Sequence, residues 1–152
     1  MHFKMIHVPT TLIVGMKQRI SDPSQAPKLI ISLWQQFFKE RSVQEIEHIA
    51  LPLRILSIYT EYEKDGSYAH IVGVPVTKLE NIASPFITCT IPEGMYSVWN
   101  GYGKPEIVHQ AWQDIWQSEK QSLRNFTIDW EEYPGVFDPN IEMPINIYLA
   151  LT

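Results

Sequence analysis

Three carboxylates stand among aromatic residues in one short stretch of the sequence, Phe126 to Tyr133, which reads FTIDWEEY. The stretch is rich in strand-forming residues, and a strand points successive side chains to opposite faces. Asp129 and Glu131 should therefore share one face, and Glu132 should point to the other. A carboxylate aimed into apolar surroundings is unfavourable unless a cation or hydrogen-bond donors meet it. Taken alone, the stretch favours carboxylates at the solvated end of a strand, and the alternative is a receptor for a cationic group.

The same glutamate could also serve an enzyme. Glu131 can act as a general base on water or, when protonated, as a general acid, because burial raises the pKa of a carboxyl group. Glu132 is a poor partner for it because the two lie on opposite faces. The sequence offers no recognisable Ser-His-Asp arrangement. Cys89 lies in a strand-like run without an evident helper and is typical of an inert buried thiol.

Metal and cofactor sites are not indicated. The five histidines are scattered without the spacing of metal ligands: His2, His7, His48, His70 and His109. The run GYGK at residues 101–104 lacks the full spacing of a phosphate loop and the Ser or Thr after its lysine. It predicts a turn ahead of a helix, and we expect no cofactor and no metal.

The bulk composition limits the class of protein. The chain has 152 residues, 45% of them hydrophobic, which suits one globular domain with a sizeable core. Its net charge of −5 argues against a basic surface, so no direct nucleic-acid partner is expected. A single cysteine excludes an internal disulfide and suits a cytoplasmic location. The N-terminus lacks a signal-peptide pattern, and no apolar run approaches the roughly 20 residues of a membrane helix.

Hydrophobic spacing predicts the elements that position the carboxylates. Helical periodicity indicates two amphipathic helices, and period-two runs bounded by Gly, Pro and Asp-Gly turns indicate the strands. In chain order we expect a long or bent strand with a bulge at Gly15, a helix, a hairpin, two more strands, a second helix and two last strands: residues 3–20, 26–41, 53–62 with 68–76, 86–91, 94–99, 105–119, 126–133 and 145–151.

The two halves of the chain, about residues 1–80 and 81–152, repeat one order of elements: strand, helix, strand, strand. The helix run LWQQFF at 33–38 corresponds to AWQDIW at 111–116. We therefore expect a single α+β domain in which two βαββ units form one antiparallel sheet about a pseudo-twofold axis. A cleft is expected at the junction, because two helices cannot cover the seam completely.

The ordered motifs resemble the GyrI-like effector-binding domain, the ligand-binding half of multidrug-responsive transcription regulators of the MerR and AraC classes. The resemblance covers nearly the whole chain. The matching residues are Ile91-Pro92-x-Gly94-x-Tyr96, Ala111-Trp112-x-x-Ile115-Trp116, Asp129-Trp130-Glu131-x-Tyr133 and Ile145-x-Ile147-Tyr148-Leu149.

The resemblance implies a duplicated βαββ fold with a central hydrophobic cleft. In the multidrug regulators, the glutamate of the Asp-aromatic-Glu-x-Tyr motif lies at the cleft base and meets lipophilic cations, and by position this residue is Glu131. Some stand-alone relatives are described as gyrase inhibitors and others as hydrolases of cyclopropane-bearing toxins. Because the domain takes up the whole length, we expect no helix-turn-helix region in this chain.

Aromatic residues are the candidate walls of the cleft: Tyr59, Trp99, Trp112, Trp116 and Tyr148. Each could equally be a core residue. With Glu131 at the base, these residues predict binding of lipophilic, cationic small molecules. A small hydrolase that uses the same cleft and a gyrase-inhibitor-like interaction protein are the alternatives.

Overall fold

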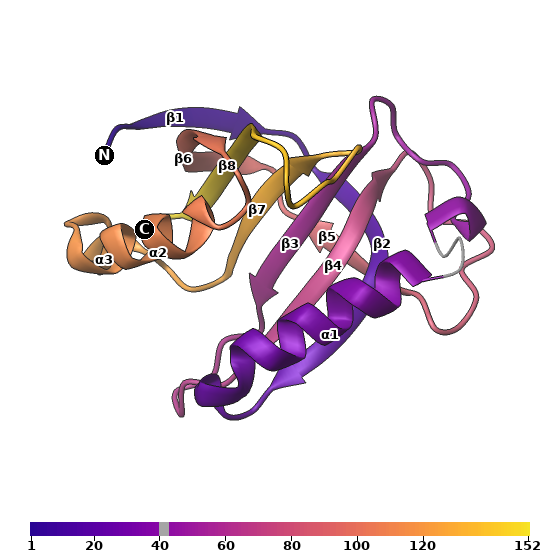
Figure 1. Cartoon of the computed structure of the whole chain (residues 1–152), viewed down its shortest axis with the longest axis horizontal. Coiled ribbons are helices and arrows are strands. Elements are labelled where there is room, and N and C mark those ends of the chain that lie inside the picture. The colour runs from indigo at the N-terminus through magenta and orange to yellow at the C-terminus, as the bar shows by residue number, and fades with distance from the viewer. Residues whose placement is uncertain (40–42) are drawn as a thin grey trace.

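A computed structural model of the chain describes residues 1–39 and 43–152 (Figure 1). The helices are α1 (Ala26–Phe38), α2 (Ile107–Gln117) and α3 (Lys120–Leu123), with short 3-10 turns at Pro23–Gln25 and Val43–Glu45. The strands are β1 (Phe3–Val8), β2 (Thr11–Ile20), β3 (Arg54–Thr60), β4 (Tyr68–Val76), β5 (Ile87–Ile91), β6 (Gly94–Gly103), β7 (Ile128–Pro134) and β8 (Met143–Ala150). The predicted α+β fold with an antiparallel sheet is confirmed. None of the described helices combines the length and the apolar character needed to span a membrane.

The strand order reflects a duplication. The sheet runs β1-β6-β8-β7-β3-β4-β2-β5, so that each strand of the first half has its counterpart at the mirrored position. The central neighbours are β3 and β7, the corresponding strands of the two halves. The first strand of each half crosses over, because β1 pairs with β6 and β5 pairs with β2. The two βαββ units are therefore interlocked at both ends of the sheet.

Residues 3–20 are not one bent strand, as the sequence predicts, but two strands with different neighbours. The break falls at Pro9 and Thr10, between β1 and β2. Proline has no N–H to donate to a sheet, which explains why the ladder stops there. The choice of β6 as the partner of β1 depends on contacts from the other half of the chain.

The predicted bulge at Gly15 is absent. Gly15 pairs with Gly73 in an uninterrupted register between β2 and β4. The two backbones approach closely, and a Cβ added at Gly73 would lie 2.7 Å from the Val14 carbonyl oxygen. A Cβ added at Gly15 would collide with the Val72 carbonyl oxygen. Glycine at this crossing therefore permits close approach of two strands.

Replacing Gly15 by alanine should lower the free energy of unfolding by roughly 2–3 kcal/mol, because backbone atoms must move apart to admit the methyl group. Urea unfolding monitored by circular dichroism measures the change. Gly94→Ala is the matched control, since its new Cβ would come no closer than 3.9 Å to Tyr96 Cε2. Equal effects of the two substitutions would contradict the close approach.

Several element boundaries differ from prediction. Strand β7 begins at Ile128 instead of Phe126, and β8 spans Met143–Ala150 instead of residues 145–151. The predicted turn at residues 101–104 is wrong, because β6 continues to Gly103, which pairs with Met143. The second helix begins at Ile107 and ends at Gln117, and the short α3 that follows was not predicted. The first helix ends at Phe38, and its predicted last residue, Arg41, lies outside the described residues.

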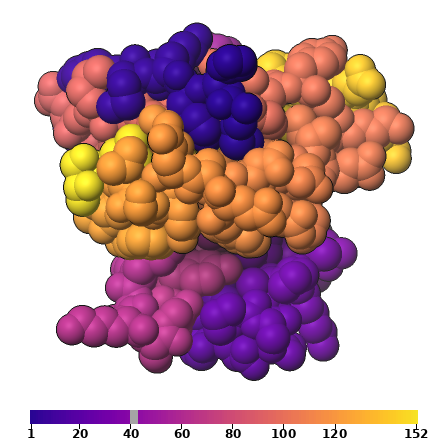
Figure 2. All heavy atoms as spheres, turned by 90° about the vertical axis from the view of Figure 1, so that its left-hand side faces the viewer, coloured from indigo at the N-terminus to yellow at the C-terminus, as the bar shows by residue number. Residues whose placement is uncertain are grey.

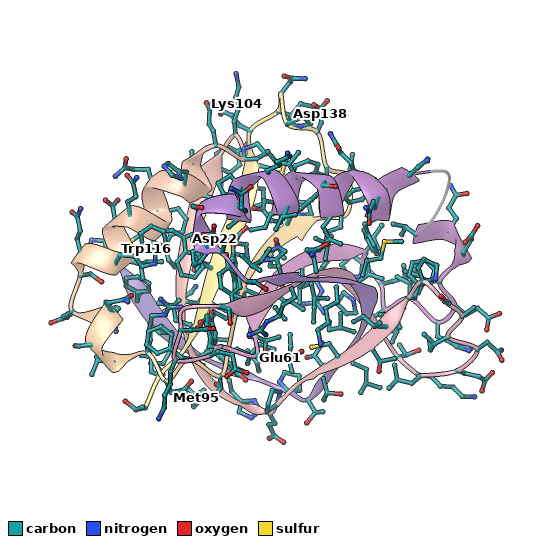
Figure 3. The ribbon with its side chains drawn as sticks, turned by 90° about the horizontal axis from the view of Figure 1, so that it is seen from below. Asp22, Glu61, Met95, Lys104, Trp116 and Asp138 are labelled. Carbon is teal, nitrogen blue, oxygen red and sulfur yellow. The ribbon has the colours of Figure 1, made fainter. Side chains whose placement is uncertain are left out.

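Both main helices lie on one side of the sheet, as the view from below shows (Figure 3). The main core fills the space between helices and sheet and includes Phe37 of α1, Ile115 of α2 and Leu149 of β8. A second apolar cluster, which includes Ile58 and Trp130, lies on the opposite face. Helix α1 contacts β2 and β4, whereas α2 belongs to the other half. The central strands β3 and β7 therefore form the floor of the space between the helices.

Candidate functional site

A cavity of about 1400 Å³ lies between the two helices. Cavities that bind small molecules usually measure about 300–1,000 Å³, so this one has room for a drug-sized ligand. Its lining residues come from the sheet floor, from both helices and from the loops at either end, and they include Ser57, Tyr59, Glu131 and Tyr133; Pro27, Ile30, Ile31 and Trp34; Val108, His109, Trp112 and Trp116; Tyr62, Tyr68, Phe126, Phe137 and Pro139. Besides Glu131, the Asp, Glu, Lys and Arg residues of the lining are Glu63, Lys64, Glu106 and Arg124. The lining is thus mainly apolar and aromatic.

The rim of the cavity carries exposed apolar side chains. Trp116 of α2 is 53% exposed and Ile31 of α1 is 59% exposed. In Figure 3, Trp116 lies on the part of α2 nearest the start of α1. Figure 2 views this end of the molecule, with the α2–α3 segment (orange) above α1 and the β3–β4 turn (purple to magenta). Residues of the α2–α3 segment, of α1 and of the β3–β4 turn all line the cavity.

Glu131 lies on the floor and is only 3% exposed. Its Oε2 accepts hydrogen bonds from the Tyr59 hydroxyl and, at 2.7 Å, from Trp112 Nε1, while Oε1 accepts from the Tyr133 hydroxyl at 2.7 Å. Strand register explains the first contact, because Glu131 pairs with Ser57 and Tyr59 is its diagonal neighbour. All three partners are neutral donors.

Burial raises the pKa of the Glu131 carboxyl, and the three hydrogen bonds oppose this rise. Burial and the nearby carboxylate raise the pKa of both Tyr59 and Tyr133 well above the usual value, so their hydroxyls remain protonated donors. Within residues 1–39 and 43–152, no Lys, Arg or His forms an ion pair with Glu131. The ionised carboxylate is therefore stabilised by hydrogen bonds from neutral donors and not by an ion pair.

Asp129, on the same face of β7, is fully buried and differs from Glu131 in having a cationic partner. Its Oδ2 accepts from Arg124 Nη2 at 2.8 Å and from the Tyr62 hydroxyl at 2.7 Å, and its Oδ1 accepts from the Ala150 N–H at 3.0 Å. Arg124 also lies 5.3 Å from the centre of the Trp112 ring and 4.5 Å from that of Phe126. Charge is thus balanced at Asp129 and unbalanced at Glu131. The sequence gives no signal for Arg124, which precedes β7 in an irregular segment.

A buried polar group next to Ser57 of the floor was also missed. His70 of β4 is fully buried, and its Nε2 lies 2.7 Å from Ser57 Oγ, to which Trp34 Nε1 also donates at 3.3 Å. Burial lowers the pKa of His70 to about 3, so the ring is neutral. Its Nδ1 has no hydrogen-bond partner among the described residues. A neutral, weakly basic imidazole without a carboxylate on its other nitrogen is poorly suited to activate Ser57 as a nucleophile.

The structure brings four of the six predicted site residues together: Tyr59, Trp112, Trp116 and Glu131 all line the cavity. Tyr148 does not, because it pairs across the sheet with Trp130 and stacks on that ring, 4.5 Å between centroids, on the opposite face. Trp99 also lies away from the cavity, on β6 beside Gly101, where it packs against the core. Glu132 points to the opposite face and pairs with Arg54 at 3.1 Å.

Several aromatic residues of the lining were not predicted for it: Trp34, Tyr62, Tyr68, Tyr133 and Phe137. Trp34 lies near the centre of the apolar stripe of α1, a position typical of a core residue. It instead forms part of the wall and contacts the rings of Tyr133 and Phe137 at centroid distances of 5.1 and 4.9 Å. A helical stripe shows which side faces inward and not whether that side meets a core or a cavity.

Among residues 1–39 and 43–152, one histidine lies close to two carboxylates on the surface: ligand atoms of Glu47, His48 and Glu80 lie within 4.8 Å of one another. The carboxylates already have partners, because Lys78 Nζ pairs with Glu80 at 2.6 Å and Asn81 Nδ2 donates to Glu47 at 3.0 Å. We assign no metal to this group.

Comparison with known proteins identifies a matching family model and solved structures with the same fold. A family model described as integron-associated effector binding protein, Cass2, matches residues 4–151. YobU of Bacillus subtilis (strain 168), which carries the name of a transcriptional regulator, is 28% identical over 155 residues, 95% of this chain and 94% of that protein. The structure of SAV2435 bound to tetraphenylphosphonium superimposes with a TM-score of 0.84 at 18% identity and covers 100% of this chain and 94% of that one. The integron cassette protein VCH_CASS2 of Vibrio cholerae superimposes with a TM-score of 0.74 at 18% identity, covering 99% and 95%.

Proposed function

We propose that this chain, which belongs to the Cass2 family of integron-associated effector binding proteins, binds lipophilic organic cations in the cavity between α1 and α2. One observation carries the proposal: Glu131 is buried in an aromatic-lined cavity without a cationic partner among the described residues. A cationic ligand would supply that partner. A cytoplasmic location and the lack of direct contact with nucleic acid belong to the same proposal.

The energetics favour a ligand that is both charged and apolar. Desolvation of a carboxylate costs several kcal/mol, which an entering cation offsets. The ring faces of Tyr59, Trp112 and Trp116 each add about 0.5–2 kcal/mol of attraction to a cation. Burial of apolar ligand surface contributes about 25 cal/mol per Å². After the cost of association, a dissociation constant near about 1 μM, roughly −8 kcal/mol, is expected.

The relatives support this class of ligand. SAV2435 binds tetraphenylphosphonium, which is a lipophilic cation without hydrogen-bond donors. The cavity of the present chain has room for such a ligand, and most of its lining is apolar. Because few directional bonds would hold the ligand, we expect broad selectivity among cations of similar size.

Titration with tetraphenylphosphonium tests the proposal, with tryptophan fluorescence as the signal. Trp34, Trp112 and Trp116 line the cavity, so ring contact should change their emission. Methyltriphenylphosphonium and triphenylphosphine oxide share three phenyl groups and differ in charge, so they are the matched pair, and the neutral oxide should bind at least about tenfold more weakly than this phosphonium. Equal affinity for the two ligands, or no saturable signal, would contradict the proposal. Turnover of a strained electrophile would instead identify a hydrolase, and a stable protein complex indifferent to cavity substitutions would identify an interaction protein.

Acidification should weaken cation binding, because a proton on Glu131 removes the charge that the ligand meets. Since burial raises the pKa of this group, the loss should begin at a higher pH than for an ordinary glutamate, about 4.3. Calorimetric titrations at successive pH values measure the change, and Glu131→Gln should show a flatter profile.

Acidification should have the opposite effect on the contribution of Glu131 to the stability of the ligand-free protein, which should increase as the pH falls. The pKa of Glu131 is higher in the folded protein than in the unfolded chain. Its contribution to the free energy of unfolding is therefore fully present below the pKa of the unfolded chain, and it is lost as the pH rises through the pKa of the folded protein. The difference in unfolding free energy between the wild type and Glu131→Gln isolates this contribution from that of other carboxylates. A difference that does not vary with pH would contradict the buried, ionising role of Glu131.

A further inference from the structure

We propose that the cavity selects among cations by the number of N–H groups that they carry, accepting quaternary and tertiary onium ions and excluding primary ammonium and guanidinium ions. This inference rests on the proposed function, because it concerns the same cavity. It goes further in naming which organic cations can reach Glu131 and which are held at the rim.

The first step is the count of acceptor positions on Glu131. A carboxylate offers roughly four lone-pair positions. The hydrogen bonds from Tyr59 and Trp112 occupy two of these lone-pair positions, both on Oε2, and the hydrogen bond from Tyr133 occupies one position on Oε1. About one position is left, on Oε1. When Glu131 is ionised, the floor therefore offers a cation one negative charge but only about one free acceptor position on a charged oxygen.

Other polar atoms of the cavity lining do not supply the missing acceptors. Ser57 Oγ is already engaged by Trp34 Nε1 and His70 Nε2. Gln121 Oε1 accepts from Arg124 Nη1 at 3.1 Å. The hydroxyl oxygens of Tyr59 and Tyr133 can accept, but neutral oxygens are weaker partners for a charged N–H than a carboxylate is.

Charged acceptors lie instead at the rim, where Glu63 and Glu106 are exposed members of the lining. A primary ammonium ion has three N–H groups and loses water from each of them on entering the floor. Each N–H left without a good acceptor should cost about tenfold in affinity. A quaternary ion has no N–H group, and a tertiary ammonium ion has one, which the remaining position on Oε1 can receive.

A matched ligand series tests the inference. The 3,3-diphenylpropyl group can carry a primary ammonium, a dimethylammonium or a trimethylammonium head, and dissociation constants are measured at about pH 8, where all three heads are charged. We expect the primary ion to bind at least about tenfold more weakly than the other two. The methyl groups add apolar surface, so the ratio of trimethylammonium to primary affinity must be compared between protein variants.

Tyr133→Phe is the decisive variant, because it frees a second position on Oε1 while the ring keeps its contacts with Trp34 and Phe137. In Tyr133→Phe, the ratio of trimethylammonium affinity to primary ammonium affinity should be smaller than in the wild type by about fivefold or more. The apolar contribution of the methyl groups is the same in both proteins and does not affect this comparison. Tyr96→Phe removes a buried hydroxyl on the other face of the sheet, where it donates to the Pro92 carbonyl, and should leave the ratio unchanged. If Tyr133→Phe does not fold, Tyr59→Phe frees a position on Oε2 and gives the same test.

The outcomes separate the two proposals. Equal affinity for the three ligands, or a ratio that Tyr133→Phe does not change, overturns the selection by N–H count and leaves the cation-binding function intact. Failure of all three ligands to bind better than a neutral diphenylpropyl compound overturns the cation-binding function itself.

Discussion

Glu131→Gln should lower the affinity for tetraphenylphosphonium by about 100-fold, the largest loss expected from any single change in the cavity. Two opposite charges about 5 Å apart at an effective dielectric constant near 20 attract by about 3 kcal/mol, and the substitution removes this attraction. Affinity for neutral aromatic ligands should stay the same, because the shape of the floor is kept. Isothermal titration calorimetry of both ligand types measures the two effects.

Glutamine can take the place of the glutamate without disrupting the floor. Its carbonyl oxygen can accept from Tyr59 and Trp112, and its amide group can donate to the Tyr133 oxygen once that hydroxyl rotates. Since a buried charge is removed, thermal stability of the ligand-free variant should equal or exceed that of the wild type. Reduced cation affinity in a fully folded variant therefore reports on charge and not on misfolding.

Glu132→Gln is the matched control for this experiment. Glu132 is the next residue along β7, points to the opposite face and pairs with Arg54. Its neutralisation changes net charge by the same amount as that of Glu131 but at a place outside the cavity. Cation affinity should change by less than about twofold. Comparable losses in the two variants would mean that the ligand responds to overall charge and not to Glu131.

Arg124→Met should lower the free energy of unfolding by about 3–5 kcal/mol, the largest loss of stability expected from a single substitution here. Arg124 is 8% exposed and forms the ion pair with Asp129, which is fully buried. Removal of the guanidinium leaves an uncompensated carboxylate in the interior, and its remaining hydrogen-bond donors among the described residues are the Tyr62 hydroxyl and the Ala150 N–H. Urea unfolding measures the loss.

A double-mutant cycle with Asp129→Asn separates the ion pair from lost packing. Arg124 contacts the rings of Trp112 and Phe126, so some stability is lost through packing alone. The double variant has no buried charge at this place and should be more stable than the sum of the two single losses predicts. Additive losses would contradict a coupled pair.

The alternation of side chains along a strand predicts which face of the sheet each residue of β7 occupies. Alternation along FTIDWEEY places Asp129 and Glu131 on one face and Trp130 and Glu132 on the other, and the structure confirms this. The interpretation of these carboxylates as solvated strand-end groups is wrong, because Asp129 and Glu131 are both buried. Alternation determines on which face a side chain lies, but not what covers that face.

The resemblance to the GyrI-like effector-binding domain is confirmed by the family match over residues 4–151 and by the shared fold. It also implied the duplicated architecture, which the mirrored strand order bears out. Motifs of this kind can be read from sequence because their order along the chain is itself part of the signal.

Sequence alone determined the helical stripes, the sidedness of β7 and the repeated order of elements, because each follows from contacts between residues a few positions apart. Tertiary structure decided the rest: the pairing of β1 with β6, the Arg124–Asp129 pair, and the face on which Tyr148 lies. Two of the three donors to Glu131 come from distant positions, because Tyr59 is 72 residues away and Trp112 is 19 residues away. Such partners meet only through strand register and helix placement, which are properties of the whole fold and leave no local pattern in the chain.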